Sequence, residues 1–201
     1  MKPILFNTPM VQDILAGRKT VTRMAIKDMD IINGWDCEAD GTPIAYIDQA
    51  TGDSYPSTAP APYQPGDILW VRETFFEYNG RYYYKADGKH NALDSLVGGS
   101  FFKWRPSIHM PREAARLFLR VTDVRVERLQ DINLDPPGPK NQVVREGLRY
   151  LSDFIAVWDR TIKPADLHLY GWEANPWCWV IAFERVSREK ALGGGGDADT
   201  L

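Results

Sequence analysis

A short run of basic and hydroxyl-bearing residues near the start of the chain has the clearest potential for chemistry. Three cations and two threonines fall within six residues: Arg18, Lys19, Thr20, Thr22 and Arg23. A threonine hydroxyl becomes an effective nucleophile when a base takes its proton, and a lysine can serve as that base where burial or a neighbouring cation favours its neutral form. The run therefore contains the parts of a small hydrolytic site. Alternatively, it is a helix end whose basic residues suit the helix dipole, which explains Arg18 and Lys19 but leaves the threonines and Arg23 unexplained.

The residues around this run predict a helix followed by a strand. Thr8 is a suitable N-cap, and Pro9 suits the first helical position. Gly17 suits the left-handed conformation that commonly ends a helix, and residues 20–22 favour an extended backbone. We therefore expect the basic residues to lie at a helix-to-strand corner, where the backbone can direct them into a cleft.

A second group of candidate residues ends the next clear strand signal. A turn at 65–67 leads into a predicted strand, 68–73, whose last residues are Arg72 and Glu73. Strand ends in barrels often line pockets, so Glu73 is an alternative acid or base. The competing interpretation of Glu73 is an ion pair with Arg72 or Arg23.

Aromatic residues could also contribute to a binding site. Trp104 and Trp177 are candidates for stacking on a nucleobase, as aromatic side chains do in single-strand binders. Tryptophans in a small domain belong more often to the core, and we expect only one or two of the seven to lie near a ligand.

The composition limits the classes of protein that fit. The chain has 201 residues, of which 44% are hydrophobic and 12% aromatic, so it is long enough for one domain with a substantial core. Its net charge is -3, from 24 basic and 27 acidic residues, which argues against non-specific duplex binding. Cys37 and Cys178 lack metal-ligand spacing, so we expect neither a metal nor a cofactor.

No segment of the sequence looks like a signal peptide or a membrane span. The chain is therefore predicted to be cytoplasmic, without a membrane partner. Protein partners cannot be inferred from the sequence.

Many short strand signals, few helices and no alternation of strand with helix predict an α+β, mainly β, domain. The clearest strands are expected at 116–129 and 176–186, and the clearest helix at 152–161. Residues 27–62 are rich in turn formers and predict a long surface insertion with a hairpin around Gly41. We expect one domain over residues 1–188, with a flexible tail at 189–201.

Four motifs, taken in order, resemble a known family. The segment from Gly17 to Arg23 resembles the opening motif of ASCH domains, small β-barrel domains related to the PUA fold. Three later segments are similar to the phage-associated branch of that family, at residues 63–74, 106–111 and 175–181. The resemblance spans about residues 3–187 and leaves 27–62 unmatched. It implies a PUA-like β-barrel with short peripheral helices and a long surface insertion.

The resemblance also implies an activity. Some ASCH proteins are amidohydrolases that act on N4-acetylcytidine, with a lysine, a threonine and a glutamate as catalytic residues. The shared opening motif places the first two on Lys19 and Thr22, and the residues before Gly147 place the third on Glu146. Such a carboxylic acid can protonate the departing amine. The other interpretation of Glu146 is an exposed carboxylate at a helix end.

The sequence departs from the family at one position. The family commonly has an arginine where this chain has Met24. Arg23 can take over from the neighbouring position, although adjacent strand residues point to opposite faces of a sheet.

Two alternatives to an enzyme remain open. The chain could be a non-catalytic binder of RNA or single-stranded DNA that uses its basic clusters and aromatics. It could also be a phage accessory protein, which only the branch resemblance suggests. In either enzyme or binder, the resemblance implies a nucleoside or an RNA-related ligand.

Overall fold

The computed structural model describes residues 1–26, 32–37, 43–48, 54–56, 61–88, 103–134 and 142–193. The chain forms two compact units, which we describe separately. Unit 1 comprises Met1–Gly17, Asp67–Arg120 and Glu184–Leu201, and unit 2 comprises Arg18–Gly66 and Val121–Phe183.

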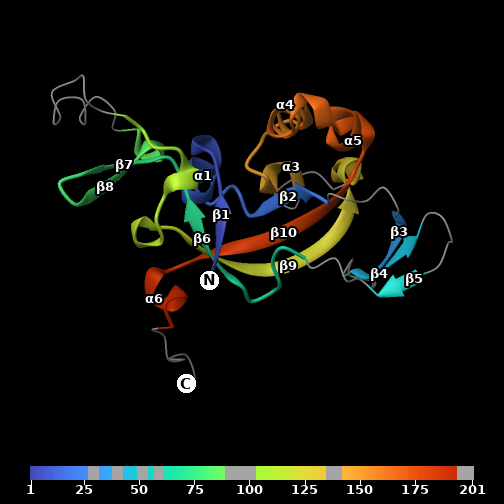
Figure 1. The fold of residues 1–201 in the computed structure, drawn as a ribbon, viewed down its shortest axis with the longest axis horizontal. Helices are drawn as coiled ribbons and strands as arrows, with labels where there is room; N and C mark the ends of the chain where they lie inside the picture. The colour runs from blue at the N-terminus through green and yellow to red at the C-terminus, as the bar shows by residue number, and fades with distance from the viewer. Residues whose placement is uncertain are drawn as a thin grey trace. The chain divides into compact units, whose positions relative to one another are not determined.

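The largest sheet has five strands in the order β1-β6-β9-β10-β2. Its strands are β1 (Lys2–Leu5), β6 (Ile68–Arg72), β9 (Phe118–Arg128), β10 (Trp177–Val186) and β2 (Val21–Ala25). The pair β1–β6 is parallel, and the pairs β6–β9 and β10–β2 are antiparallel. The strands β9 and β10 are long and curved (Figure 1), and each contributes residues to both units.

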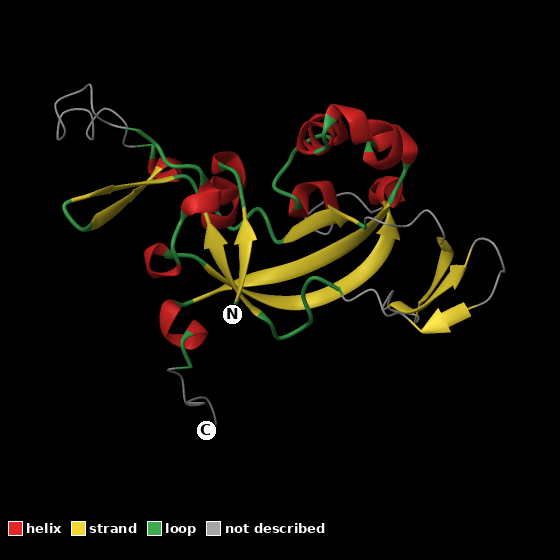
Figure 2. Ribbon diagram, in the orientation of Figure 1, coloured by secondary structure: helices red, strands yellow, loops and turns green. Residues whose placement is uncertain are grey.

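The predicted mainly β, PUA-like barrel is wrong. The described strands form open sheets, with β1 and β2 at the edges of the five-stranded sheet, and helices accompany them in a mixed α/β arrangement (Figure 2). The sequence patterns correctly indicated extended segments, because alternation of apolar and polar residues reports which face of a strand is buried. Closure depends instead on whether the first and last strands pair, and no local pattern reports that.

Unit 1 places helix α1 (Thr8–Leu15) beside the short strands β1 and β6. The N-cap of α1 is Asn7, whose side chain accepts a hydrogen bond from the Met10 amide, so the predicted cap, Thr8, is the first helical residue instead. A hairpin follows β6, formed by β7 (Phe75–Tyr78) and β8 (Arg81–Tyr84). Unit 1 also contains these short helices: η1 (Lys85–Asp87), η2 (Ser107–His109), η3 (Arg112–Ala114) and α6 (Arg188–Ala191).

Unit 2 covers one face of its strands with helices. These are η4 (Leu129–Leu134), α3 (Gln142–Arg145), α4 (Leu151–Thr161), η5 (Pro164–Asp166), α5 (Leu167–Tyr170) and η6 (Trp172–Ala174). The predicted helix at 152–161 is confirmed and begins one residue earlier. Its buried residues Phe154 and Trp158 pack with Trp172, Cys178 and neighbouring aliphatic side chains in the core of this unit.

The range predicted as a surface insertion contains a small sheet of its own. Its strands are β3 (Ile32–Cys37), β4 (Pro43–Asp48) and β5 (Ser54–Pro56), in that order. The strands β3 and β4 pair antiparallel on either side of the predicted hairpin position, Gly41, which itself lies outside the described residues. The glycine-rich segment after η1 lies outside them as well.

Candidate functional site

Two of the three predicted catalytic residues meet in the interior of unit 2. Lys19 Nζ donates a hydrogen bond to Glu146 Oε2 at 2.5 Å, although the residues are 127 positions apart in the sequence. The lysine side chain is 0% exposed and that of Glu146 is 5% exposed. Lys19 Nζ also donates to the carbonyl oxygens of Val21, at 2.8 Å, and Glu146, at 3.2 Å. The ammonium is therefore surrounded by oxygen acceptors.

The backbone on both sides fixes this contact. Lys19 and Glu146 form an isolated antiparallel bridge, and the Thr20 amide donates to the Arg145 carbonyl at 2.7 Å. The short helix α3 ends just before Glu146, and Gly147 then adopts a positive φ of 89°. Such a φ favours glycine and turns the chain away from the helix. Glu146 is consequently buried beside Lys19, and its interpretation as an exposed helix-end carboxylate is wrong.

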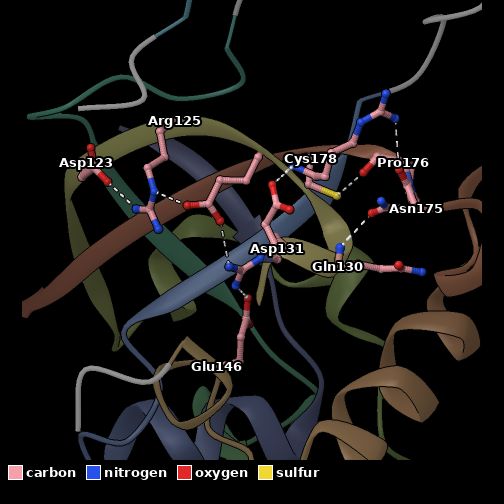
Figure 3. Close-up of polar contacts among 11 residues, drawn as sticks. Asp123, Arg125, Gln130, Asp131, Glu146, Asn175, Pro176 and Cys178 are labelled. Carbon is pink, nitrogen blue, oxygen red and sulfur yellow. Dashed lines mark hydrogen bonds and ion pairs between the residues drawn. The ribbon is translucent and has the colours of Figure 1, made fainter. Parts of the chain in front are cut away.

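Arg23 extends the pair into a network of ions. From strand β2, its NH1 donates to Glu146 Oε1 at 3.1 Å, and its NH2 donates to Glu127 Oε2 at 3.1 Å. Glu127 lies on β9, where its other oxygen accepts from Arg125 Nε at 2.5 Å. Arg125 NH1 donates in turn to Asp123 Oδ2 at 2.6 Å. Figure 3 shows these contacts running from Asp123 and Arg125 toward Glu146.

Thr22 and Arg18 stand apart from the pair. Thr22 is buried in β2 opposite Ile181 of β10, but makes no side-chain hydrogen bond to Lys19 or Glu146 among the described residues. Residues alternate between the faces of a strand, so Thr22 faces away from the side that carries Arg23. Arg18 is exposed just before Lys19. The structure thus joins the predicted base and acid, and leaves the predicted nucleophile outside their hydrogen bonds.

Glu73 and Arg72 belong to unit 1 and have other partners. Glu73 is 1% exposed and accepts two hydrogen bonds from Arg116, from Nε at 2.8 Å and from NH2 at 3.0 Å. Arg116 also binds Asp87 and lies over the ring of Tyr84, 3.9 Å from its centroid. Burial raises the pKa of Glu73, against the opposing effect of Arg116. The predicted partners of Glu73, Arg72 and Arg23, are therefore wrong.

Arg72 instead donates to the Ile108 carbonyl and lies over the ring of Trp70. The two tryptophans predicted to stack on a ligand are both half-buried. Trp177 in unit 2 is covered by the guanidinium of Arg128 at 4.2 Å, so an arginine already occupies one of its faces. Trp104 lies in unit 1.

Cys178 is fully buried within the core of unit 2, and burial raises the pKa of its thiol. It is a small apolar residue of that core. Among the residues that the structure describes, no three His, Cys, Asp or Glu side chains gather as metal ligands would.

The sequence analysis missed Glu127 and Arg125. The sequence did contain a pattern that indicates them, because Asp123, Arg125 and Glu127 occupy alternate positions of one strand and therefore share a face. What the sequence could not supply was the partner across the sheet, Arg23. Lys19 and Glu146 are thus a hydrogen-bonded amine and carboxyl group, two kinds of side chain that serve in general acid–base chemistry.

Comparisons with known proteins give little further guidance. The sequence matches no protein-family model, and no curated protein matches it significantly. A solved structure of a protein from Enterococcus faecalis, described by the family model DUF984, matches this chain at 12% identity with a TM-score of 0.44. The alignment covers 93% of this chain and 82% of that one. This similarity is too weak to assign a fold or a function.

No helix in the described ranges is long and apolar enough to cross a membrane.

Proposed function

We propose that the chain is an ASCH-type amidohydrolase that removes an acyl group from the exocyclic nitrogen of a modified nucleobase, with N4-acetylcytidine as the reference substrate. The observation that carries the proposal is the buried contact of 2.5 Å between Lys19 Nζ and Glu146 Oε2. The sequence motifs alone had indicated both residues as catalytic, so the contact between them is an independent observation. A cytoplasmic location is part of the same proposal.

The pair can supply both proton transfers of the reaction. A proton that passes from Nζ to Oε2 leaves a neutral amine and a carboxylic acid. The amine takes a proton from water as the water oxygen attacks the acyl carbon, and the carboxylic acid protonates the nitrogen as the carbon–nitrogen bond breaks. The products are the free base and a carboxylic acid. Water is the nucleophile in this scheme because the Thr22 hydroxyl makes no hydrogen bond to Lys19 or Glu146 among the described residues.

The direct test is incubation of the purified protein with N4-acetylcytidine, with cytidine and acetate measured as products. We expect the wild-type protein to release both in equal amounts. Lys19→Met and Glu146→Gln should each lower the rate at least about a hundredfold, the lower range for the loss of an acid or base. Thr22→Ala should keep most of the activity, and a complete loss there would restore the threonine as the nucleophile.

A matched control separates catalysis from the loss of an ion pair. Arg120 and Glu184 form an exposed pair in unit 1, with side chains 55% and 47% exposed. Glu184→Gln should leave the rate unchanged. The double variant Lys19→Met/Glu146→Leu removes both buried charges, and hydrophobic replacement of a buried ion pair is often tolerated. We expect it to fold without activity. Absence of turnover by the wild-type protein would contradict the proposal.

A non-catalytic nucleic-acid binder is less well supported. Two of the three cations expected at the basic corner, Lys19 and Arg23, are buried and hydrogen-bonded to glutamates. They are not presented to a phosphate backbone.

A further inference from the structure

The charges around the candidate site alternate in sign along a continuous chain of contacts. The order, from the surface inward, is Asp123, Arg125, Glu127, Arg23, Glu146 and Lys19. The side chain of Asp123 is 42% exposed, whereas those of Arg23 and Lys19 are 1% and 0% exposed. Every contact lies within unit 2. A charge change at one residue can therefore alter the next contact in the chain.

Arg23 is the residue on which the geometry of the site depends. Its two terminal nitrogens bind different carboxylates, NH1 to Glu146 and NH2 to Glu127, each at 3.1 Å. An arginine ordinarily prefers to grip one carboxylate with two parallel hydrogen bonds. Moreover, Arg23 Nε is buried without a hydrogen-bond partner among the described residues. Arg23 is thus held between two carboxylates, and its Nε–H makes no hydrogen bond among the described residues.

We propose that Glu127 is a positioning residue. By binding Arg23 NH2, it limits Arg23 to one hydrogen bond with Glu146, so that Glu146 Oε2 remains available to Lys19. With Glu127 present, Glu146 divides its carboxylate between Arg23, at Oε1, and Lys19, at Oε2. Without the charge of Glu127, Arg23 can bind both oxygens of Glu146 in a bidentate pair, which would displace Lys19 from Oε2. The catalytic consequence rests on the proposed function, but the effect on the lysine does not.

The first experiment measures kcat and KM for deacylation by Glu127→Gln, which keeps the shape of the side chain and removes its charge. We expect kcat to fall between about tenfold and a hundredfold, as for other displacements of catalytic groups, with KM nearly unchanged. Adding Arg23→Met should restore much of the lost rate, because the competing guanidinium is then gone. If Glu127 and Arg23 had only structural roles, adding Arg23→Met to Glu127→Gln would lower kcat further. Additive losses would overturn the proposal.

The second experiment does not need turnover. The side-chain ammonium of Lys19 is followed by NMR in protein labelled with 15N-lysine. Glu127→Gln should shift this resonance and speed its hydrogen exchange, while Glu184→Gln should leave both unchanged. Glu127→Gln/Arg23→Met should bring the resonance back toward its wild-type position. An unchanged resonance in folded Glu127→Gln would overturn the proposal.

The two experiments fail in different ways. If the wild-type protein has no turnover but the resonance moves as expected, the proposed function fails and the positioning role stands. If Glu127→Gln does not fold, the double variant Glu127→Gln/Arg23→Met, which lacks both the Glu127 carboxylate and the Arg23 guanidinium, decides the matter. A near-wild-type Lys19 resonance there supports the proposal, and a displaced one contradicts it.

Discussion

Glu73 and Glu146 are both buried carboxylates, but the cations that face them differ in arrangement. Glu73 receives two hydrogen bonds from one arginine, Arg116, which is also held by Asp87 and by the ring of Tyr84. Every partner in that group is fixed by another, as in a structural clamp. Glu146 is instead divided between an ammonium and a guanidinium, each at one oxygen. The second arrangement can rearrange when a proton moves, which suits catalysis better.

From the burial of Glu73 we predict that the stability of the protein depends on pH. Because burial raises the pKa of Glu73 above its ordinary value of 4.5, the folded protein holds this proton at a pH where the unfolded chain has released it. The contribution of Glu73 to the free energy of unfolding therefore falls as pH rises from about 4.5 through the raised pKa. Glu73→Gln should remove this part of the slope in urea unfolding measured across that range.

The exposed side chain of Leu192, which carries no titratable group, provides the comparison. Leu192→Ala should keep the wild-type slope of stability against pH. If Glu73→Gln keeps that slope as well, the carboxyl of Glu73 does not titrate within the window and the raised pKa is contradicted.

At the residue level, the sequence predicted the pairing at the site better than its surroundings. Lys19 and Glu146 were found through the motifs because each lies in a short, locally recognisable segment. The partner of Glu73 was misassigned because an ion pair across the fold leaves no mark on either segment. Glu127 was missed for the same reason, since its strand pattern is visible but Arg23 is 104 residues away.

At the level of elements, the one-turn helix α3 and the glycine that follows it place the acid. Gly147 N donates to the Val144 carbonyl at 2.9 Å, which closes the turn at a φ of 89°. The turn of the hairpin β7–β8 likewise depends on residues with positive φ, here Asn79 and Gly80. That turn and the strand after it were predictable, since Asn-Gly is a strong hairpin signal. From the sequence, Gly147 indicated only the end of a helix and not its part in placing Glu146.

A substitution at Gly147 should therefore affect both stability and activity. Gly147→Ala forces a left-handed conformation on a residue with a Cβ atom, at a cost of roughly 1–2 kcal/mol. Relief of that strain would move Glu146 away from Lys19, so we expect the rate of deacylation to fall about tenfold or more. The measurements are urea unfolding and the N4-acetylcytidine assay.

Gly88 offers a matched control in unit 1. It also has a positive φ, of 67°, and a Cβ atom added there would meet no atom within 4 Å. Gly88→Ala should cost a similar free energy of unfolding while the rate of deacylation stays at the wild-type value. An equal loss of activity in both variants would show that general destabilisation, rather than displacement of Glu146, is responsible.

For the whole molecule, the main discrepancy between prediction and structure is the difference between a closed barrel and open sheets. Strand β9 shows how local patterns can be correct while the conclusion is wrong. Its buried residues change phase, from Leu119 and Val121 to Val124 and Val126. The strand nevertheless continues to Arg128 without a break. Pairing order and closure arise from contacts between distant segments, which periodicity does not encode.

The distribution of charge over the whole chain gives the last prediction, which concerns nucleic acid. The net charge is -3, and of the three cations at the predicted basic corner only Arg18 is exposed. Each phosphate contact with a single strand contributes roughly 0.7 to the slope of log affinity against log salt. Three contacts would give a slope of about 2, whereas Arg18 alone gives less than 1. A fluorescence titration with single-stranded RNA across salt concentrations should show weak binding with the smaller slope. Arg18→Gln should abolish that slope. A slope of about 2 that falls by only about 0.7 in this variant would show that further cations contact the strand, and would revive the nucleic-acid binder as the better account of the corner.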